Sequence, residues 1–172
     1  MLSMLYCGNP FLNKTVDPVT VFDSSVEKLI EELFEVMDAN NGVGLAAPQV
    51  GINKRIFVVD TRQNGERLAF INPEIIATSD DSVPYEEGCL SVPGVFRTIY
   101  RPSTVEISYK KHNGKSEIIR ASGLLARVIQ HENDHLNGRL FISRLSDEEM
   151  QDSVREFRKK NKHLLKKINA HG

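Results

Sequence analysis

The sequence predicts an α+β fold in which mostly antiparallel strands surround a central helix that carries an HExxH motif. Three observations lead to this expectation. Helical periodicity is confined to residues 24–39, 122–136 and 147–169, which adds an N-terminal and a C-terminal helix to the central one. Short apolar runs cluster between the first two helices instead of alternating with them, which favours antiparallel sheet over a doubly wound fold. The Asn113-Gly114 pair between two of these runs is a strong hairpin signal.

The N-terminal helix is expected at residues 24–39, where apolar side chains recur every three or four positions. Ser24 and Glu27 have the spacing of a capping box, which satisfies backbone N–H groups of the first helical turn. After this helix the pattern changes to that of strands, and Pro73 is expected to end one of them. The expected strands span residues 55–60, 68–72, 95–100, 104–109 and 116–120.

The C-terminal segment combines helical periodicity with positive charge. Ser146 and Glu149 form a capping box, and an apolar stripe follows at Met150, Val154, Phe157, Leu164 and Ile168. Residues 155–172 carry seven Lys or Arg side chains and one acidic side chain, so the rest of the chain is acidic. We predict a single domain spanning residues 1–172, in which residues 146–172 form a basic amphipathic helix.

Composition narrows the class of protein. The 172 residues are 40% apolar and 26% charged, which argues against disorder. The net charge of −1 argues against a globally basic nucleic-acid-binding protein but allows a local basic patch. No apolar run approaches the ~20 residues that cross a bilayer, and the first ten residues lack a signal-peptide pattern. Two cysteines are too few for a disulfide framework. We therefore expect a reduced, cytoplasmic protein that binds neither membrane nor DNA.

The helix expected at residues 122–136 contains the candidate chemistry. Its HExxH motif places His131 and His135 four residues apart on one helical face, so both imidazoles can reach one metal ion. Glu132 can then contact a water at that metal and act as a general acid or base without ligating the ion. The helix is expected to be buried because apolar residues precede the motif, and such a motif is costly to bury without a metal.

A catalytic site of this kind needs a third protein ligand. Cys89 is a candidate, because it lies between Gly88 and the Pro93-Gly94 pair in a segment typical of a tight, irregular turn. The alternative is an inert core thiol, which is the usual role of a free cysteine. Cys7 has no comparable surroundings and is interpreted as structural.

Residues 41–51 contain three glycines and two alanines, so a ligand could approach the backbone closely there. The glycine spacing fits neither a dinucleotide-binding fingerprint nor a P-loop. For the glycines alone, a tight connection between a helix and a strand is the favoured explanation.

Together, these three segments closely resemble the motifs of the peptide deformylase family. The family patterns GxGxAAxQ, EGCxS and QHExDH match, in this order, Gly42-Val43-Gly44-Leu45-Ala46-Ala47-Pro48-Gln49, Glu87-Gly88-Cys89-Leu90-Ser91 and Gln130-His131-Glu132-Asn133-Asp134-His135. The resemblance covers essentially the whole chain. Asn133 stands where the family commonly has an apolar residue, and Arg127 is expected near the rim of the substrate pocket.

The resemblance implies an enzyme that removes the N-formyl group from the N-terminal methionine of newly made proteins and releases formate. It implies Cys89, His131 and His135 as ligands of one Fe²⁺ per chain, which Ni²⁺, Co²⁺ or Zn²⁺ can replace. Glu132 would be the general acid and base. The Gln49 side chain and the backbone N–H of Leu90 would stabilise the oxyanion, as preorganised donors do.

The resemblance also implies how substrate binds. The nascent formyl-Met polypeptide would lie extended between Gly42–Gly44 and the segment at Glu87–Gly88, which is recognition by strand addition. The apolar pocket for the methionine side chain would be formed by Val43, Leu124 and Val128. Glu87 and Arg101 are interpreted as a structural ion pair without a chemical role of their own.

Two alternatives come from different classes of protein. An ordinary HExxH metallopeptidase would use a downstream third ligand, for which the candidates Glu148, Glu149, Glu156 and His163 are poorly placed. A catalytically dead binding protein would be expected to have lost a motif residue, and none is lost. The basic tail could bind the ribosome through RNA phosphates, or could be a helix that packs on the domain with its charges in solvent.

Overall fold

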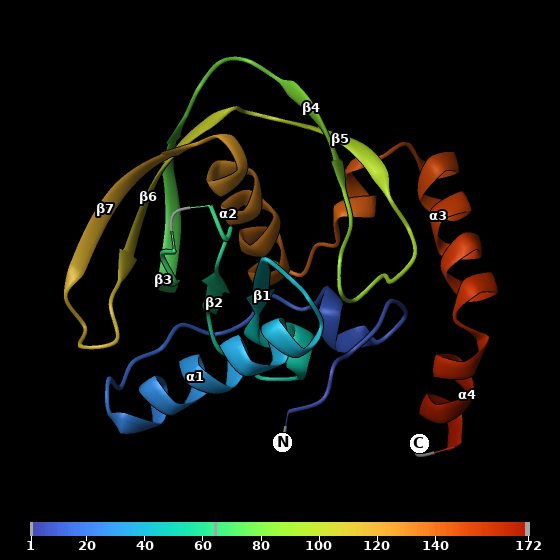
Figure 1. The fold of residues 1–172 in the computed structure, drawn as a ribbon, viewed down its shortest axis with the longest axis horizontal. Helices are drawn as coiled ribbons and strands as arrows, with labels where there is room; N and C mark the ends of the chain where they lie inside the picture. The colour runs from blue at the N-terminus through green and yellow to red at the C-terminus, as the bar shows by residue number, and fades with distance from the viewer. Residues whose placement is uncertain (1, 64, 171–172) are drawn as a thin grey trace.

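The computed structural model describes residues 2–63 and 65–170, with side chains described as far as residue 167. Helix α2 (Gly123–Leu136) runs through the middle of the molecule (Figure 1). Helix α1 (Ser24–Ala39) lies at one end, and helices α3 (Asp147–Lys160) and α4 (Lys162–Ala170) follow one another along one side. This arrangement confirms the expected α+β class. None of the described helices has the length and apolar character that crossing a membrane requires.

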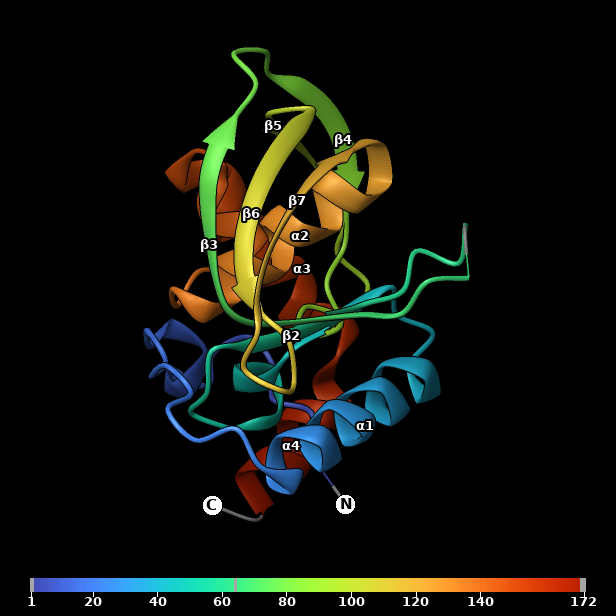
Figure 2. The same cartoon turned by 90° about the vertical axis from the view of Figure 1, so that its left-hand side faces the viewer.

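All strand pairs in the described chain are antiparallel. One sheet has the order β1-β2-β3-β6-β7, and the other pairs β4 with β5. The strands are β1 (Gly44–Ala46), β2 (Ile56–Val59), β3 (Leu68–Thr78), β4 (Val83–Glu87), β5 (Arg97–Arg101), β6 (Thr104–Lys110) and β7 (Ser116–Ser122). Strand β3 pairs with β2 through its first part and with β6 through its second, so the sheet changes direction along it (Figure 2).

Helix α2 is held in place by burial of its apolar face against the larger sheet. Val128 and Ile129 pack in one cluster with Phe57, Phe70 and Ile107 of the strands. The rings of Phe57 and Phe70 stack with centroids 4.8 Å apart. Because this side of α2 is fixed by packing, the polar residues on its other side have defined positions.

Two further clusters position the remaining elements. Apolar residues of α1 pack against β1 and β2, which orders the glycine-rich segment that follows this helix. The third cluster joins the 3₁₀ helices η1 (Pro10–Asn13) and η3 (Phe141–Arg144) to the segment after Cys89 and to Phe157 of α3. Phe157 is only 1% exposed, so α3 is part of the domain core and not an appended tail.

The structure corrects several sequence predictions. Strand β3 does not end at residue 72 but continues past Pro73 to Thr78. The pairing register shifts between Ile71 and Glu74, so the proline occupies an irregular position where no ladder N–H is needed. The cap of α1 is Asp23, whose carboxylate accepts from the backbone N–H of Ser25, and not Ser24.

The C-terminal helix was predicted to be continuous but is divided at Asn161. The Asn161 amide donates to the carbonyls of Phe157 and Pro93, and this side chain is buried. The capping box of Ser146 and Glu149 at its start is confirmed. Strands β1 and β4 were not predicted, because β1 is only three residues long and β4 contains Pro84.

Candidate active site

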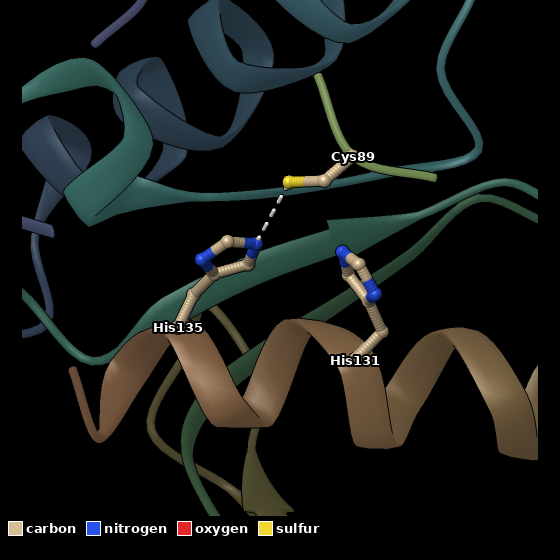
Figure 3. A group of neighbouring side chains, drawn as sticks. All are labelled: Cys89, His131 and His135. Carbon is tan, nitrogen blue, oxygen red and sulfur yellow. Dashed lines mark hydrogen bonds between the residues drawn. The ribbon is translucent and has the colours of Figure 1, made fainter. Parts of the chain in front are cut away.

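Cys89, His131 and His135 come together at the centre of the molecule. One donor atom from each residue lies within 4.8 Å of the others, and Cys89 Sγ is 3.4 Å from His135 Nε2. Both imidazoles rise from the same face of α2, and the thiol approaches them from the segment after β4 (Figure 3). The HExxH spacing explains the two histidines, while the position of Cys89 depends on contacts between distant segments.

Glu87, two residues before the cysteine, orients His131. Its Oε1 lies 2.8 Å from His131 Nδ1, which leaves the Nε2 atom of that ring for a metal. Burial by itself would raise the pKa of Glu87, but hydrogen bonds from His131 and Arg101 and the charge of Arg101 hold the pKa well below its ordinary value. The carboxylate is therefore ionised and can fix the tautomer of the imidazole.

Two arginines complete the environment of Glu87. Arg101 binds both of its oxygens at 2.7 and 3.0 Å and also donates to Asp134 at 2.9 Å. Arg127 donates to Glu87 Oε2 at 2.9 Å and to the backbone carbonyls of Ile99 and Val83. The Arg101 side chain is 1% exposed. Buried charges of this kind are tolerated only when they are paired and fully hydrogen-bonded, as these are.

Glu132 occupies a buried position beside the three candidate ligands. Burial is the largest cause of a rise in its pKa to about 7, opposed in part by the charge of His131. Its Oε2 atom is buried and has no hydrogen-bond partner in the described part of the chain. A group with this pKa can both accept and return a proton near neutral pH.

Gln49 lines the same cavity and approaches Cys89. It belongs to the 3₁₀ helix η2 (Ala47–Val50), and its Oε1 atom accepts from the N–H of Ala46 at 2.9 Å. Its amide nitrogen therefore points the other way, 3.1 Å from Ser91 Oγ and 3.6 Å from Cys89 Sγ. This orientation presents an N–H donor to the site.

These residues border a cavity of about 660 Å³. Its walls include the glycine-rich segment before β1, strand β4 and the start of α2. A side chain is excluded at Gly44, because a Cβ added there would lie 2.6 Å from Glu132 Oε1 and 2.8 Å from Val128 Cγ1. Glu132 and Val128 of α2 therefore pack directly against the Gly44 backbone at the cavity wall.

The donor set fits a transition-metal ion. One thiolate and two imidazoles suit zinc, iron, cobalt and nickel, and three protein ligands leave one coordination position for water or substrate. Burial and the neighbouring charge of His131 hold the pKa of His135 well below its ordinary value. Glu132 lines the same cavity as Cys89 and His131, so a carboxylate is available beside the candidate ligands, which is what a metal-dependent hydrolase requires.

Comparisons with known proteins agree with this geometry. The family model described as polypeptide deformylase matches residues 1–151. The peptide deformylase of Treponema pallidum (strain Nichols) is 43% identical over 156 residues, covering 91% of this chain and 95% of the relative. The crystal structure of a peptide deformylase from Legionella pneumophila superposes with a TM-score of 0.88 at 37% identity, covering 100% of this chain and 99% of the other.

The chain belongs to the peptide deformylase family. It is a hydrolase that removes the N-formyl group from the N-terminal formyl-methionine of newly synthesised proteins and releases formate. A peptide deformylase from Synechococcus elongatus, solved in complex with actinonin, is also similar, with a TM-score of 0.85 and 41% identity over 90% of this chain and 86% of the other. Recognition from the three motifs is thus confirmed.

The structure brings nearly all the predicted site residues to one cavity. Those that line it are Gly42, Val43, Gly44, Gln49, Glu87, Gly88, Cys89, Leu90, Leu124, Val128, His131 and Glu132. His135 lies just behind this lining at 1% exposure. Val43 is 37% exposed, so it forms part of the mouth of the cavity and not of its depth. The predicted ion pair of Glu87 with Arg101 is confirmed.

Arg127 was expected near the rim of the pocket, and it does line the cavity, where it is 6% exposed and its guanidinium binds Glu87. Sequence reasoning missed other residues of this cavity. The ring of Phe96 covers Gly88, where an added Cβ would lie 2.7 Å from a ring carbon. His163 and Leu164 of α4 also reach the wall. Only the glycine before Cys89 signalled such a close approach, and no local pattern indicated the contribution of α4.

Proposed function

We propose that Cys89, His131 and His135 bind one Fe²⁺ per chain, and that Ni²⁺, Co²⁺ or Zn²⁺ can replace it. The convergence of their three donor atoms within 4.8 Å beside a buried carboxylate is the observation that supports this most strongly. When bound, the metal supplies a Lewis acid that activates water and polarises the formyl group. The whole chain, residues 1–172, then acts as a single catalytic domain.

In this proposal Glu132 moves the proton. Its carboxylate accepts a proton from the attacking water and donates it to the amide nitrogen of the substrate. The C–N bond then breaks, which gives formate and a free methionine amine. The pKa of about 7 supports both directions of transfer near neutral pH. The amide N–H of Gln49 and the backbone N–H of Leu90 stabilise the charge that develops on the formyl oxygen, and one such donor contributes about 3 kcal/mol.

The substrate is proposed to lie between two backbone segments. Gly42, Val43 and Gly44 pair with one edge of the extended peptide, and the backbone of Glu87–Gly88 pairs with the other. The Glu87 side chain points away from the peptide, toward His131. The methionine side chain enters the pocket formed by Val43, Leu124 and Val128. Backbone pairing of this kind tolerates varied residues after the first one.

The cytoplasm is the proposed location, because newly initiated chains appear there. The basic residues of α3 and α4 are proposed to bring the enzyme to the ribosome. The exposed cations of these helices include Arg158, Lys159, Lys162 and Lys166, and such a cluster attracts RNA phosphates. Lys160 instead donates to the carbonyl of Gly94 and to Glu156, so it has a structural contact as well.

The decisive experiment compares Cys89→Ala with Cys7→Ala after anaerobic purification. Cys89→Ala is expected to lose bound metal and deformylation together, while Cys7→Ala retains both, because only Cys89 belongs to the ligand group. Activity is measured on formyl-Met-Ala, with acetyl-Met-Ala and unblocked Met-Ala-Ser as controls. Full metal occupancy in Cys89→Ala would contradict the ligand assignment, and cleavage of the unblocked peptide would instead indicate a peptidase.

A further inference from the structure

A second hollow adjoins the active-site cavity. This groove has a volume of about 980 Å³ and lies between the N-terminal segment, α1 and α4. Tyr6, Asn40 and Leu164 line both the groove and the cavity. The two hollows are therefore neighbours, and a chain that leaves the cavity over these three side chains meets the groove next.

The geometry of the glycine-rich segment indicates which way the substrate leaves. Gly44 is next to Glu132, whereas Gly42 is next to Leu90 and Met37, at the end of α1. A peptide that lies along this segment with its formyl end at Glu132 must continue past Gly42. The next residues of the protein in that direction are Asn41 and Asn40, and Asn40 is part of the wall shared with the groove.

The chemistry of the groove suits an extended polypeptide with a basic side chain. Its apolar wall is formed by Leu2, Met4, Val36, Ala39 and Leu164. Glu32 and Glu35, which lie on one face of α1, add two carboxylates, against one ammonium group from Lys167. The groove thus combines apolar surface with an excess of negative charge.

We propose that this groove binds the part of the nascent chain downstream of the residues held along Gly42–Gly44, and that Glu32 and Glu35 favour a basic residue there. The proposal rests on the proposed function, because it takes the formyl end of the substrate to lie at Glu132. Each further residue of an extended chain advances about 3.3 Å, so a position a few residues beyond the methionine reaches the groove.

The test uses the metal-loaded enzyme and formyl-Met peptides of increasing length. A single Lys or Glu is placed at each position from the third to the eighth in otherwise neutral peptides. The wild-type enzyme is compared with Glu32→Gln/Glu35→Gln, and with Glu31→Gln, which changes an exposed carboxylate of the same helix outside the groove. Formyl-Met-Ala, which is too short to reach the groove, is measured with all three enzymes.

The wild-type enzyme is expected to prefer Lys over Glu by about three- to tenfold in kcat/KM at one or two adjacent positions, mainly through KM. The preference should decrease with added salt and disappear in Glu32→Gln/Glu35→Gln, but persist in Glu31→Gln. Equal rates for Lys and Glu peptides at every position would overturn the proposal. It would also be overturned if Glu31→Gln lost the preference for Lys to the same extent as Glu32→Gln/Glu35→Gln. If formyl-Met-Ala itself is not cleaved, the proposed function fails; if it is cleaved without any charge preference, only the groove assignment fails.

Discussion

Glu87→Gln tests how far a residue that does not touch the substrate controls the metal site. The Glu87 carboxylate accepts from His131 at 2.8 Å, from Arg101 at 2.7 and 3.0 Å, and from Arg127 at 2.9 Å. Glutamine has nearly the same shape, but it is neutral and has only one acceptor oxygen. At least one of these donors must then face an amide N–H group.

The expected loss follows from the change of a charged acceptor to a neutral one. A hydrogen bond to a charged group contributes about 1.5–3 kcal/mol, against about 0.5–1.5 kcal/mol for a neutral pair. The His131 bond should therefore weaken by about 1.4 kcal/mol, which is tenfold in binding. Changes to residues that orient a metal-bound histidine typically cost about 10–100-fold in metal affinity or activity. The fold should survive, because Arg101 keeps Asp134 and Arg127 keeps two backbone carbonyls.

Metal affinity can be measured by competition with a chelator, together with thermal unfolding of the same preparations. Glu86→Gln is the matched control, because it changes the neighbouring, exposed carboxylate on the same strand. Glu87→Gln is expected to bind metal at least tenfold more weakly than Glu86→Gln while still unfolding cooperatively. Equal metal affinity in the two variants would refute the positioning role of Glu87.

Other predictions concern the proton carrier, the substrate channel and the tail. Glu132→Ala should keep its metal but lose about 10²–10⁴-fold in kcat, measured with metal analysis on the same sample. In the wild type, kcat/KM should fall as pH decreases, because the Glu132 carboxylate must be ionised to accept a proton. The midpoint should lie at or below about 7, because the positive charge of a bound metal lowers the pKa of Glu132. A flat pH profile would contradict this. Gly44→Ala places a Cβ 2.6 Å from Glu132 Oε1 and should reduce kcat by about 10²-fold without loss of metal. Replacing Lys159, Lys162 and Lys166 with Gln should weaken ribosome co-sedimentation and its salt dependence but leave hydrolysis of formyl-Met-Ala unchanged. Charge removal is preferable to truncation, which would expose the core at Phe157.

Much of the secondary structure could be predicted, because helical periodicity and turn residues are reliable wherever tertiary packing favours the same local structure. The bounds of α1 match the expected residues 24–39, and the hairpin of β6 and β7 lies on either side of Asn113-Gly114. Prediction failed where distant contacts outweigh local preference. Pro73 lies within β3 because the ladder shifts its register around it, and α3 ends where Asn161 binds the carbonyl of Pro93.

The candidate site shows the same division. The pairing of His131 with His135 follows from helical spacing alone. The local sequence of Cys89 made it only a candidate ligand and favoured an inert thiol, and the resemblance to a family then implied that it binds the metal. The structure brings the three together. The bond of Arg127 to Glu87 and the contribution of α4 to the cavity had no signal in the sequence, because these contacts join segments that are far apart along the chain.

The sequence by itself determined the α+β class, the helix that carries HExxH, and the family whose motifs it contains. These depend on periodicity and on short spacings, which a linear pattern records directly. Only the tertiary structure decided that Glu87 holds His131, that Glu132 is buried enough to raise its pKa to about 7, and that a groove beside α1 adjoins the cavity. Burial, charge pairing and cavity shape arise from segments that meet only after folding, so no local pattern could have specified them.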